Sequence, residues 1–519
     1  MTEAPRLPSH LARYVVPQDY DAYTPRDHAV WRHILTRLTR RLGDRAHPSY
    51  LKGLEAAGIG VEAIPRLEDM DRKLSRFGWR AVGVRGFIPP AVFTEMQALG
   101  VLAIAADIRD HGHVAYTPAP DIVHESAGHA PILADPRYAE YVKRCGVAGF
   151  KAIASREDQA VFEAVRHLSV VREDPGSTAE DEAAALDRLG AARASRTYVS
   201  EGTRASRLYW WTAEYGLVGS LGHPRIYGAG LLSSLGEAAH CLTGEVGKIP
   251  LSLACVDRDF DITAMQPQLY VARDFEHLFD VLEAFEATLA WKRGGRYGLE
   301  EALRAGTVNH LVLASGLEIT GRVKALPAGL AVLEGPVLVS RAGLAQGEPW
   351  PGQALVAFGP GSLPANGAFR LDLPEGVSLS GFRVDGHETI HLEGTQQGRP
   401  LTLPARALFF LAQDLPSVAG GPADPEAWDR HFGGQPAADP EAERLARQRK
   451  AQALPAPLAA LYQEVRELRR DRGAGRDRLR EIRRALSGFP GEWLLLAEVE
   501  ELLAPSPSPD SVGLHLERA

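Results

Sequence analysis

Residues 116–131 read YTPAPDIVHESAGHAP, and this stretch decides how the rest of the chain is interpreted. His124 and His129 flank a glutamate within it, and a proline-rich turn precedes them. Imidazole nitrogen binds iron, zinc and copper, so two histidines this close together indicate a candidate metal site. A pair of histidines alone is also compatible with a purely structural role, and a third ligand is needed to decide.

The spacing of the two histidines does not suit an ordinary α-helix. Five residues turn an ideal helix by about 500°, which leaves the side chains roughly 140° apart. The zinc-protease motif HExxH has a spacing of four instead. We therefore expect the helix to be interrupted or to end near Gly128 and Pro131, because glycine and proline permit such an ending.

Glu214, in the segment LYWWTAEYGL (208–217), is the candidate third ligand. An ionised carboxylate on an apolar, aromatic helix is costly to bury unless it is paired or bound to a metal. Two histidines and one carboxylate form the facial triad of non-haem iron(II) oxygenases, which leaves positions open for O2 and water. The alternative is a buried ion pair between Glu214 and Arg207 or Arg225.

A zinc hydrolase is a second reading of the same residues, with Glu125 as the general base beside His124, His129 and Glu214. The histidine spacing differs from that of the common metalloproteases, which favours the oxygenase. Consumption of O2 during turnover would separate the two readings.

Composition limits the partners and the location. The net charge of −8 repels phosphate backbones and anionic lipid, so we expect neither nucleic acid nor membrane as a partner. Three cysteines without CxxC spacing exclude a disulfide framework and a cysteine-rich zinc site. The N-terminus has no secretory signal pattern and no 18-residue apolar stretch occurs, so we expect a cytoplasmic protein.

At 519 residues the chain is too long for one core, and the predicted fold class is multidomain. Residues 26–296, after an N-terminal extension (1–25), form a mostly α-helical catalytic domain. AVWRHILTRLTRRLG and FTEMQALGVLAIAADI in this range have apolar residues at helical spacing. Residues 155–204 are an insertion that reads as two helices joined by a PGS turn.

The C-terminal half has a different pattern. Short apolar runs separated by glycine and proline predict a small all-β domain over 300–412. A linker over 413–440, a helical C-terminal region over 441–504 and a flexible tail over 505–519 follow. This half is the candidate interface of a homo-oligomer. Its arginine-rich segment RELRRDRGAGRDRLREIRRA could bind an acidic partner, but mixed charges favour a solvated helix.

Several separated motifs in this order resemble the catalytic domain of the tetrahydropterin-dependent aromatic amino acid hydroxylases. They are DHAVWR, FGWRAVGVRGFIPPAVF, IRDHGHVAYTPAPDIVHESAGHAP, YWWTAEYGL and IYGAGLLSSLGEAAHCL. The resemblance fades near Gly295 and covers a little over half of the chain. It implies that Fe(II), a tetrahydropterin and O2 hydroxylate an aromatic amino acid. Phenylalanine is the favoured substrate, with tryptophan or tyrosine as alternatives.

The resemblance also implies roles for individual residues. The iron ligands correspond to His124, His129 and Glu214. The pterin contacts correspond to Gly86, Ile88, Phe93, Glu125 and Tyr209, with Phe93 stacking on the flat ring. Arg109 corresponds to the residue that pairs with the substrate carboxylate, for which a guanidinium is well shaped. The remaining substrate contacts correspond to Tyr116, Thr117, Trp210, Gly230 and Ser233.

This sequence departs from the family pattern in three ways. The insertion between His129 and Glu214 is much shorter in compact members, so the region at the mouth of the site is not transferable. We expect no regulatory domain ahead of the catalytic part, and therefore no allosteric activation by substrate. A β domain and a helical tail replace the tetramerisation helix of the animal enzymes.

Overall fold

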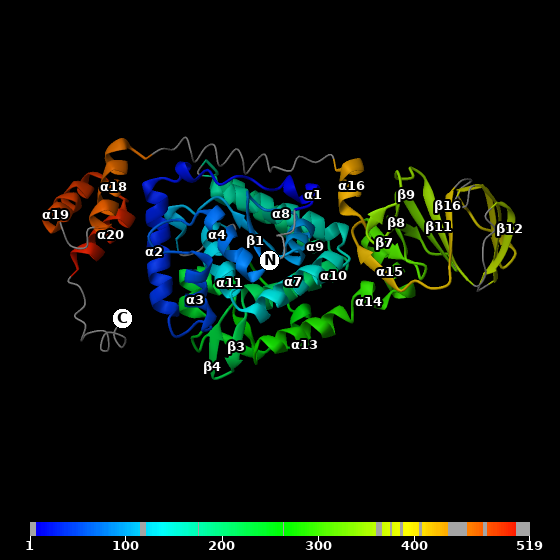
Figure 1. Ribbon diagram of the computed structural model, residues 1–519, viewed down its shortest axis with the longest axis horizontal. Helices are drawn as coiled ribbons and strands as arrows, with labels where there is room; N and C mark the ends of the chain where they lie inside the picture. The colour runs from blue at the N-terminus through cyan, green and yellow to red at the C-terminus, as the bar shows by residue number, and fades with distance from the viewer. Residues whose placement is uncertain are drawn as a thin grey trace.

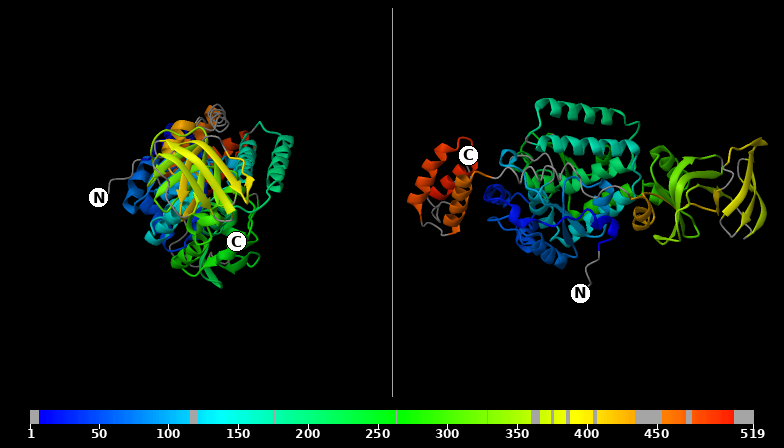
Figure 2. Two further views of the ribbon diagram at one scale, coloured as in Figure 1. Left: turned by 90° about the vertical axis from the view of Figure 1, so that its right-hand side faces the viewer. Right: turned by 90° about the horizontal axis from the view of Figure 1, so that it is seen from above.

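The structure is a computed structural model, and it has an elongated shape. A helical body lies between a β-rich part at one end and the C-terminal helices at the other (Figure 1). The two further views agree with this arrangement (Figure 2). The structure describes residues 7–114, 121–174, 176–262, 264–327, 329–359, 366–373, 376–384, 388–403, 407–433, 454–470 and 475–504.

The body is built from helices that enclose one large apolar core. Its helices are α1 (Ser9–Ala12), α2 (Pro25–Leu42), α3 (Ser49–Ala57), α4 (Leu67–Leu74), α5 (Pro90–Ala98), α6 (Ala130–Ile132), α7 (Pro136–Lys151), α8 (Arg156–Glu173), α9 (Ala179–Ala194), α10 (Glu201–Tyr209), α11 (Ala229–Ser233), α12 (Leu235–His240) and α13 (Phe275–Glu286). The next two helices, α14 (Ala290–Arg293) and α15 (Gly295–Ala305), contribute buried residues to a second core that contains the β strands after them. The predicted helix in AVWRHILTRLTRRLG is confirmed as part of α2. It starts at Pro25 because Thr24 and Asp27 form a capping box that satisfies the first N–H groups.

The two helices predicted between residues 155 and 204 are confirmed as α8 and α9. Each begins with a capping box, from Ser155 and Thr178 respectively. The pair packs through a small apolar cluster of its own, and it lies along one side of the body in the right-hand view of Figure 2.

The prediction that helix continues through FTEMQALGVLAIAADI was wrong for its second half. Helix α5 ends at Ala98, and β2 (Val101–Ala105) pairs in parallel with β1 (Arg80–Val84). Gly100 allows the chain to turn because its φ of 72° lies in the left-handed region. All five residues of β2 are buried, and a strand covered on both faces has no alternation by which to recognise it.

The body also contains a four-stranded sheet, in the order β4-β3-β6-β5. Its strands are β3 (Leu217–Ser220), β4 (His223–Ile226), β5 (Gly247–Pro250) and β6 (Gln268–Ala272). Strand β3 begins three residues after Glu214, so the sheet fixes the segment that carries this carboxylate.

The C-terminal part contains one sheet of eleven strands among the described residues. They are β7 (Asn309–Val312), β8 (Leu317–Ala325), β9 (Leu330–Arg341), β10 (Leu344–Ala345), β11 (Gln353–Phe358), β12 (Gly367–Leu373), β13 (Val377–Val384), β14 (Glu388–Gln396), β15 (Arg399–Pro400), β16 (Ala407–Ala412) and β17 (Ser417–Gly420). The pairing is antiparallel except between β11 and β16. The β character predicted for this region is therefore present, while the domain boundaries stay predictions.

The linker predicted over 413–440 was wrong for the part of it that is described. Strand β17 pairs with β7, and α16 (Pro425–Phe432) follows it. The pairing buries Val418 in a core that β7 and α15 share, which a short glycine-rich run did not reveal. The N-cap Asp424 and Pro425 at the first helical position start α16.

The C-terminal part has the helices α18 (Ala456–Arg470), α19 (Arg476–Ala485) and α20 (Trp493–Leu503). Of these, α18 and α20 pack against α2, and α19 packs against α20. Their apolar residues, among them Tyr462 and Val499, belong to the core cluster of the body. Arg32 of α2 binds Glu498 of α20 through two hydrogen bonds of 2.7 and 3.0 Å, and both side chains are buried. No helix in the described ranges is long and apolar enough to cross a membrane.

Candidate metal centre

Both segments that carry the predicted ligands are π-helical. His124–His129 forms one such segment, and Trp210–Glu214 forms the other at the end of α10. In a π-helix each N–H bonds five residues back, so residues five apart lie on the same side. The expected interruption of the α-helix is therefore a widened turn and not an end, because the chain continues as helix through Pro131 into α6.

Gly128 allows the widened turn to sit close to α11. A Cβ atom at this position would lie 2.6 Å from the carbonyl oxygen of Ala229. Only glycine lets the two backbones approach in this way. The approach brings Ser233, at the end of α11, next to the first histidine.

The three predicted ligands meet at one point. His124 Nε2 lies 3.3 Å from Glu214 Oε2, and His129 Nε2 lies 3.0 Å from Glu214 Oε1. One ligand atom from each residue lies within 4.8 Å of the others, and no other group of this kind occurs among the described residues. Ligands about 2.1 Å from a metal are about 3 Å apart when adjacent at right angles, so the separations fit a shared ion.

The hydrogen bonding around the histidines also fits a metal. Ser233 donates its hydroxyl to Ala229 O at 2.7 Å, so its oxygen accepts from His124 Nδ1 at 3.0 Å. This contact leaves the lone pair of His124 Nε2 facing the site. The buried His129 Nε2 has no hydrogen-bond partner among the described residues, despite its closeness to Glu214.

The electrostatics differ for the two glutamates. Burial of Glu214 opposes its ionisation, but His129 and His124 outweigh this effect and its pKa is lowered. Burial raises the pKa of Glu125 to about 8, and the carboxylates of Glu214 and Asp121 add to the rise. Oxygen Oε2 of Glu125 is buried without a hydrogen-bond partner among the described residues. Glu214 is thus an anionic ligand, and Glu125 is a polar group beside the site.

The alternative reading of Glu214, a buried ion pair with Arg207 or Arg225, is not what the structure shows. Arg207 reaches Val256 O and Asp259, and Arg225 donates to the carbonyl oxygens of Asp44 and Ala46. Neither guanidinium contacts Glu214, so the two histidines are its partners.

Two of the residues predicted to contact a pterin, Phe93 and Tyr209, are linked to His129 by ring contacts. Phe93 on α5 meets Tyr209 edge to face, with ring centroids 5.8 Å apart. The Tyr209 ring is nearly parallel to that of His129 at 6.3 Å. Gly86 adopts a φ of 63° in the turn after β1, and the side chain of Ile88 packs into an apolar cluster with Met96.

Arg109 is buried and not a surface charge. Its Nε and Nη2 bind the two carboxylate oxygens of Asp121, each at 2.8 Å. Asp121 also accepts the backbone N–H of His124 at 3.0 Å, so the same carboxylate anchors a histidine ligand. Arg109 Nη1 is buried and has no partner among the described residues. It is a free donor held in a fixed position.

Trp210 is fixed by stacking. The rings of Phe260 and Tyr215 are nearly parallel to it, with centroids 4.1 and 4.4 Å away. Gly230 leaves room for this arrangement, because a Cβ there would lie 2.8 Å from the Tyr215 ring. The indole Nε1 of Trp210 has no hydrogen-bond partner in the described parts of the chain. Tyr116 and Thr117 lie outside the described residues.

Sequence reasoning missed three residues of the site: Asp121, Gln97 and Phe260. Asp121 stands three residues before His124, a spacing at which an aspartate often caps a helix, and this signal could have identified it. Gln97 and Phe260 lie 112 and 50 residues from their aromatic partners Tyr209 and Trp210, and no local pattern marks them.

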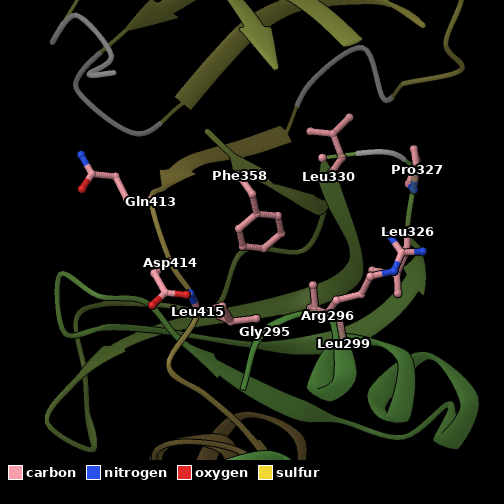
Figure 3. Close-up of a pocket in the computed structure, with 11 residues that line it drawn as sticks. Gly295, Arg296, Leu299, Leu326, Pro327, Leu330, Phe358, Gln413, Asp414 and Leu415 are labelled. Atoms are coloured by element: carbon pink, nitrogen blue, oxygen red, sulfur yellow. The ribbon is translucent and has the colours of Figure 1, made fainter. Parts of the chain in front are cut away.

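A separate hollow of about 250 Å³ lies between α15 and the β strands. Figure 3 shows Phe358 in its middle, with Arg296 and Asp414 at opposite sides. Its walls come from α15, the β8–β9 connection, the end of β11 and the segment after β16. None of these segments carries a predicted iron ligand, so the hollow does not belong to the metal centre.

Comparison with known proteins gives a family match that coincides with the body. A family model described as "Biopterin-dependent aromatic amino acid hydroxylase" matches residues 16–173 and 154–299. Together these ranges span more than half of the chain and include all three predicted ligands.

Individual relatives match the same region. The phenylalanine-4-hydroxylase of Mesorhizobium japonicum is 30% identical over 288 residues, which is 54% of this chain and 88% of the relative. The phenylalanine-4-hydroxylase of Pseudomonas aeruginosa is 30% identical over 53% of this chain and 88% of its own. A structure of the Chromobacterium violaceum phenylalanine hydroxylase, with bound iron(III) and 7,8-dihydrobiopterin, is 28% identical over 53% of this chain and 85% of that chain, with a TM-score of 0.42.

Proposed function

We propose that this chain, which belongs to the biopterin-dependent aromatic amino acid hydroxylases, uses iron(II), a tetrahydropterin and O2 to hydroxylate L-phenylalanine to L-tyrosine. The observation that carries the proposal is the convergence of His124, His129 and Glu214 on one point. The buried, unpartnered nitrogen of His129 supports it, because a metal ion would satisfy that atom.

The three ligands would hold iron on one face and leave the opposite face open. Iron and the reduced pterin together supply the activation of O2 and the electrons that ring hydroxylation requires. Ser233 keeps His124 in the tautomer that binds a metal, and Asp121 fixes the backbone of the same residue. The chain's own contribution is therefore a rigid set of donors.

The pterin would lie on the side of Phe93 and Tyr209, where aromatic rings suit a flat heterocycle. Gly86 and Ile88 would offer backbone groups there, and the free oxygen of Glu125 would hydrogen-bond the pterin through solvent.

The substrate carboxylate would bind Arg109, whose side chain Asp121 holds in place. A preorganised guanidinium loses little conformational freedom on binding, which favours the amino acid over an amine. Trp210, Gly230 and Ser233 would contact the rest of the substrate, together with Tyr116 and Thr117. The fixed plane of Trp210 offers an edge that orients the phenyl ring.

Phenylalanine is preferred over tryptophan and tyrosine because the relatives of known name are phenylalanine hydroxylases. Zinc hydrolysis is disfavoured, since the chain belongs to an oxygenase family. A homo-oligomer through the C-terminal half and a cytoplasmic location stay predictions. Light scattering during size-exclusion chromatography measures the oligomeric state directly.

The test is a turnover experiment on the full chain. The protein is loaded with Fe(II) without oxygen and then given tetrahydrobiopterin, O2 and each aromatic amino acid in turn. We expect tyrosine from phenylalanine, identified by mass, with oxidation of the pterin. Hydroxylated tryptophan or 3,4-dihydroxyphenylalanine as the main product would favour the alternative substrates. Absence of any pterin-dependent product from iron-replete protein would reject the proposed reaction.

A further inference from the structure

Gln97 is a buried polar residue next to the pterin side of the site. It lies on α5, one helical turn after Phe93, and is 2% exposed. Its Nε2 donates a hydrogen bond to the hydroxyl of Tyr209. Its Oε1 is buried without a hydrogen-bond partner in the described parts of the chain. Burying an amide that is only half satisfied is unfavourable, so a packing role alone would be better served by an apolar side chain.

Tyr209 connects the metal ligands to the predicted pterin contact. It is the last residue of α10 and directly precedes the π-helical segment that ends at Glu214. Its ring is nearly parallel to that of His129 at 6.3 Å and perpendicular to that of Phe93 at 5.8 Å. The orientation of this ring therefore affects both halves of the site.

Among the described residues, Gln97 provides the hydrogen bond to the hydroxyl group of Tyr209. The ring neighbours His129 and Phe93 constrain the ring body, whereas the bond from Gln97 holds the polar end. Gln97 itself cannot move freely, because α5 packs closely on α7. A Cβ at Gly146 of α7 would lie 2.9 Å from Gln97 Cβ. The hydrogen bond from the amide therefore ties Tyr209 to a helix whose position is fixed by packing.

We infer that Gln97 is a positioning residue: its side-chain amide holds Tyr209 against His129 and Phe93, so that the pterin binds in the orientation that couples its oxidation to ring hydroxylation. This inference rests on the proposed function. In the part of the chain that the structure describes, Gln97 is hydrogen-bonded to Tyr209 and to none of the three predicted ligands, so it acts through Tyr209.

The experiment compares the full-length parent with Gln97→Met, Tyr209→Phe and the double variant. Methionine keeps the unbranched shape of glutamine but donates no hydrogen bond. Met96→Leu, one residue earlier on α5 and fully buried, is the matched control for a packing change. Three quantities are measured: tyrosine formed per pterin oxidised, the Kd of 7,8-dihydrobiopterin for metal-free protein by calorimetry, and the Kd of Co²⁺.

We expect Gln97→Met to weaken dihydrobiopterin binding about fivefold, the loss typical of one neutral hydrogen bond, and to lower the yield of tyrosine per pterin. Cobalt affinity should stay unchanged, because the three ligands are intact. Tyr209→Phe should give the same losses, and the double variant should lose nothing more. Met96→Leu should behave like the parent.

Parent-like dihydrobiopterin binding and tyrosine yield in Gln97→Met would overturn the inference. A double variant whose losses equal the sum of those of Gln97→Met and Tyr209→Phe would overturn it too. If Gln97→Met does not fold, Tyr209→Phe decides alone. A parent-like yield of tyrosine per pterin oxidised in Tyr209→Phe also overturns the inference. A parent that forms no product rejects the proposed function instead. In that case the calorimetric comparison still decides whether Gln97 and Tyr209 shape the pterin side.

Discussion

Glu214 is the one anionic side chain of the predicted iron triad, and its charge is stabilised by two imidazoles in a buried setting. Removing it should leave two neutral ligands. We expect Glu214→Ala to weaken metal binding by at least about 100-fold. Calorimetric titration with Co²⁺ measures this, with Glu283→Ala on the exposed face of α13 as the control. Unchanged affinity in Glu214→Ala would remove the residue from the ligand set.

Arg109 is best tested by lysine, because alanine would leave Asp121 buried without its cation. Lysine keeps the charge but loses the planar fork, so it cannot hold Asp121 and a substrate carboxylate together. We expect Arg109→Lys to raise the KM for phenylalanine by about tenfold or more, the loss of one charge-assisted hydrogen bond. Phenethylamine has no carboxylate, so Arg109→Lys and the parent should turn it over at the same low rate. An unchanged KM for phenylalanine would contradict the assigned role.

Glu237 on α12 provides a pH-dependent contribution to stability that is separate from catalysis. Burial raises the pKa of its carboxyl group from about 4.5 to about 7, although the N–H of Gln266 partly counteracts this. The native state therefore binds a proton more tightly than the unfolded state between these values. The free energy of unfolding should fall as pH rises from about 4.5 to 7, by up to about 1.4 kcal/mol per pH unit.

Replacing Glu237 by glutamine should remove this contribution. The difference in unfolding free energy between the parent and Glu237→Gln, measured with urea at several pH values, should decrease as pH rises through that window. Parallel pH profiles for the two proteins would show that the carboxyl group does not titrate as expected.

Individual site residues could be predicted from the sequence where a known motif contains them. The two histidines and Glu214 could be identified from residue type, spacing and an apolar setting, and they do converge. Gln97 and Phe260 could not, because their significance arises from contacts between distant segments. The role of Ser233 as an acceptor for His124 likewise depends on how α11 lies beside the π-helical turn.

Helix geometry explains how five-residue spacing becomes a ligand pair. The spacing indicated correctly that a regular α-helix could not bring His124 and His129 to one metal. It did not indicate which irregular helix would replace it. A π-helical turn differs from an α-helical end only in backbone hydrogen bonds, which side-chain patterns do not encode. Strand β2 was missed for a related reason, since an apolar run buried on both faces fits either kind of element.

The closeness of the π-helical turn to α11 gives a test at Gly128. We expect Gly128→Ala to push α11 away, because the added Cβ would lie 2.6 Å from a backbone oxygen. The shift should displace Ser233 from His124 and weaken Co²⁺ binding about 10- to 100-fold. Gly190→Ala, on the exposed side of α9 with no atom near its Cβ position, is the control.

That control should stabilise the protein slightly, by about 0.5 to 1 kcal/mol, because alanine favours a helix. Both variants are compared by thermal unfolding and by cobalt titration. Normal metal affinity in folded Gly128→Ala would show that the close approach is not needed for the site.

Across the whole molecule, the C-terminal helices complete the core of the body. Arg32 and Glu498 lie 466 residues apart and form a buried ion pair with two hydrogen bonds. Amphipathic patterns predicted the helices themselves, but the pattern does not state which surface an apolar face will cover. The same reason explains why β17 could not be recognised from the sequence that contains it.

Breaking that ion pair should be costly. We expect Arg32→Met to lower the free energy of unfolding by about 3–5 kcal/mol, because Glu498 then remains buried without its main cation. The double variant Arg32→Met/Glu498→Met should recover most of the loss, since apolar side chains fill the same space. Urea unfolding measures both. A small effect of Arg32→Met would mean that Arg469, 3.8 Å from Glu498, already compensates the charge.

The central claim is that one iron ion binds where His124, His129 and Glu214 meet. The most direct test is an anomalous difference map from crystals of the iron-loaded protein, measured at the iron absorption edge. We predict a single strong peak about 2.1 Å from His124 Nε2, His129 Nε2 and an oxygen of Glu214. A map with no peak at this point, or with the iron bound by other residues, would contradict it.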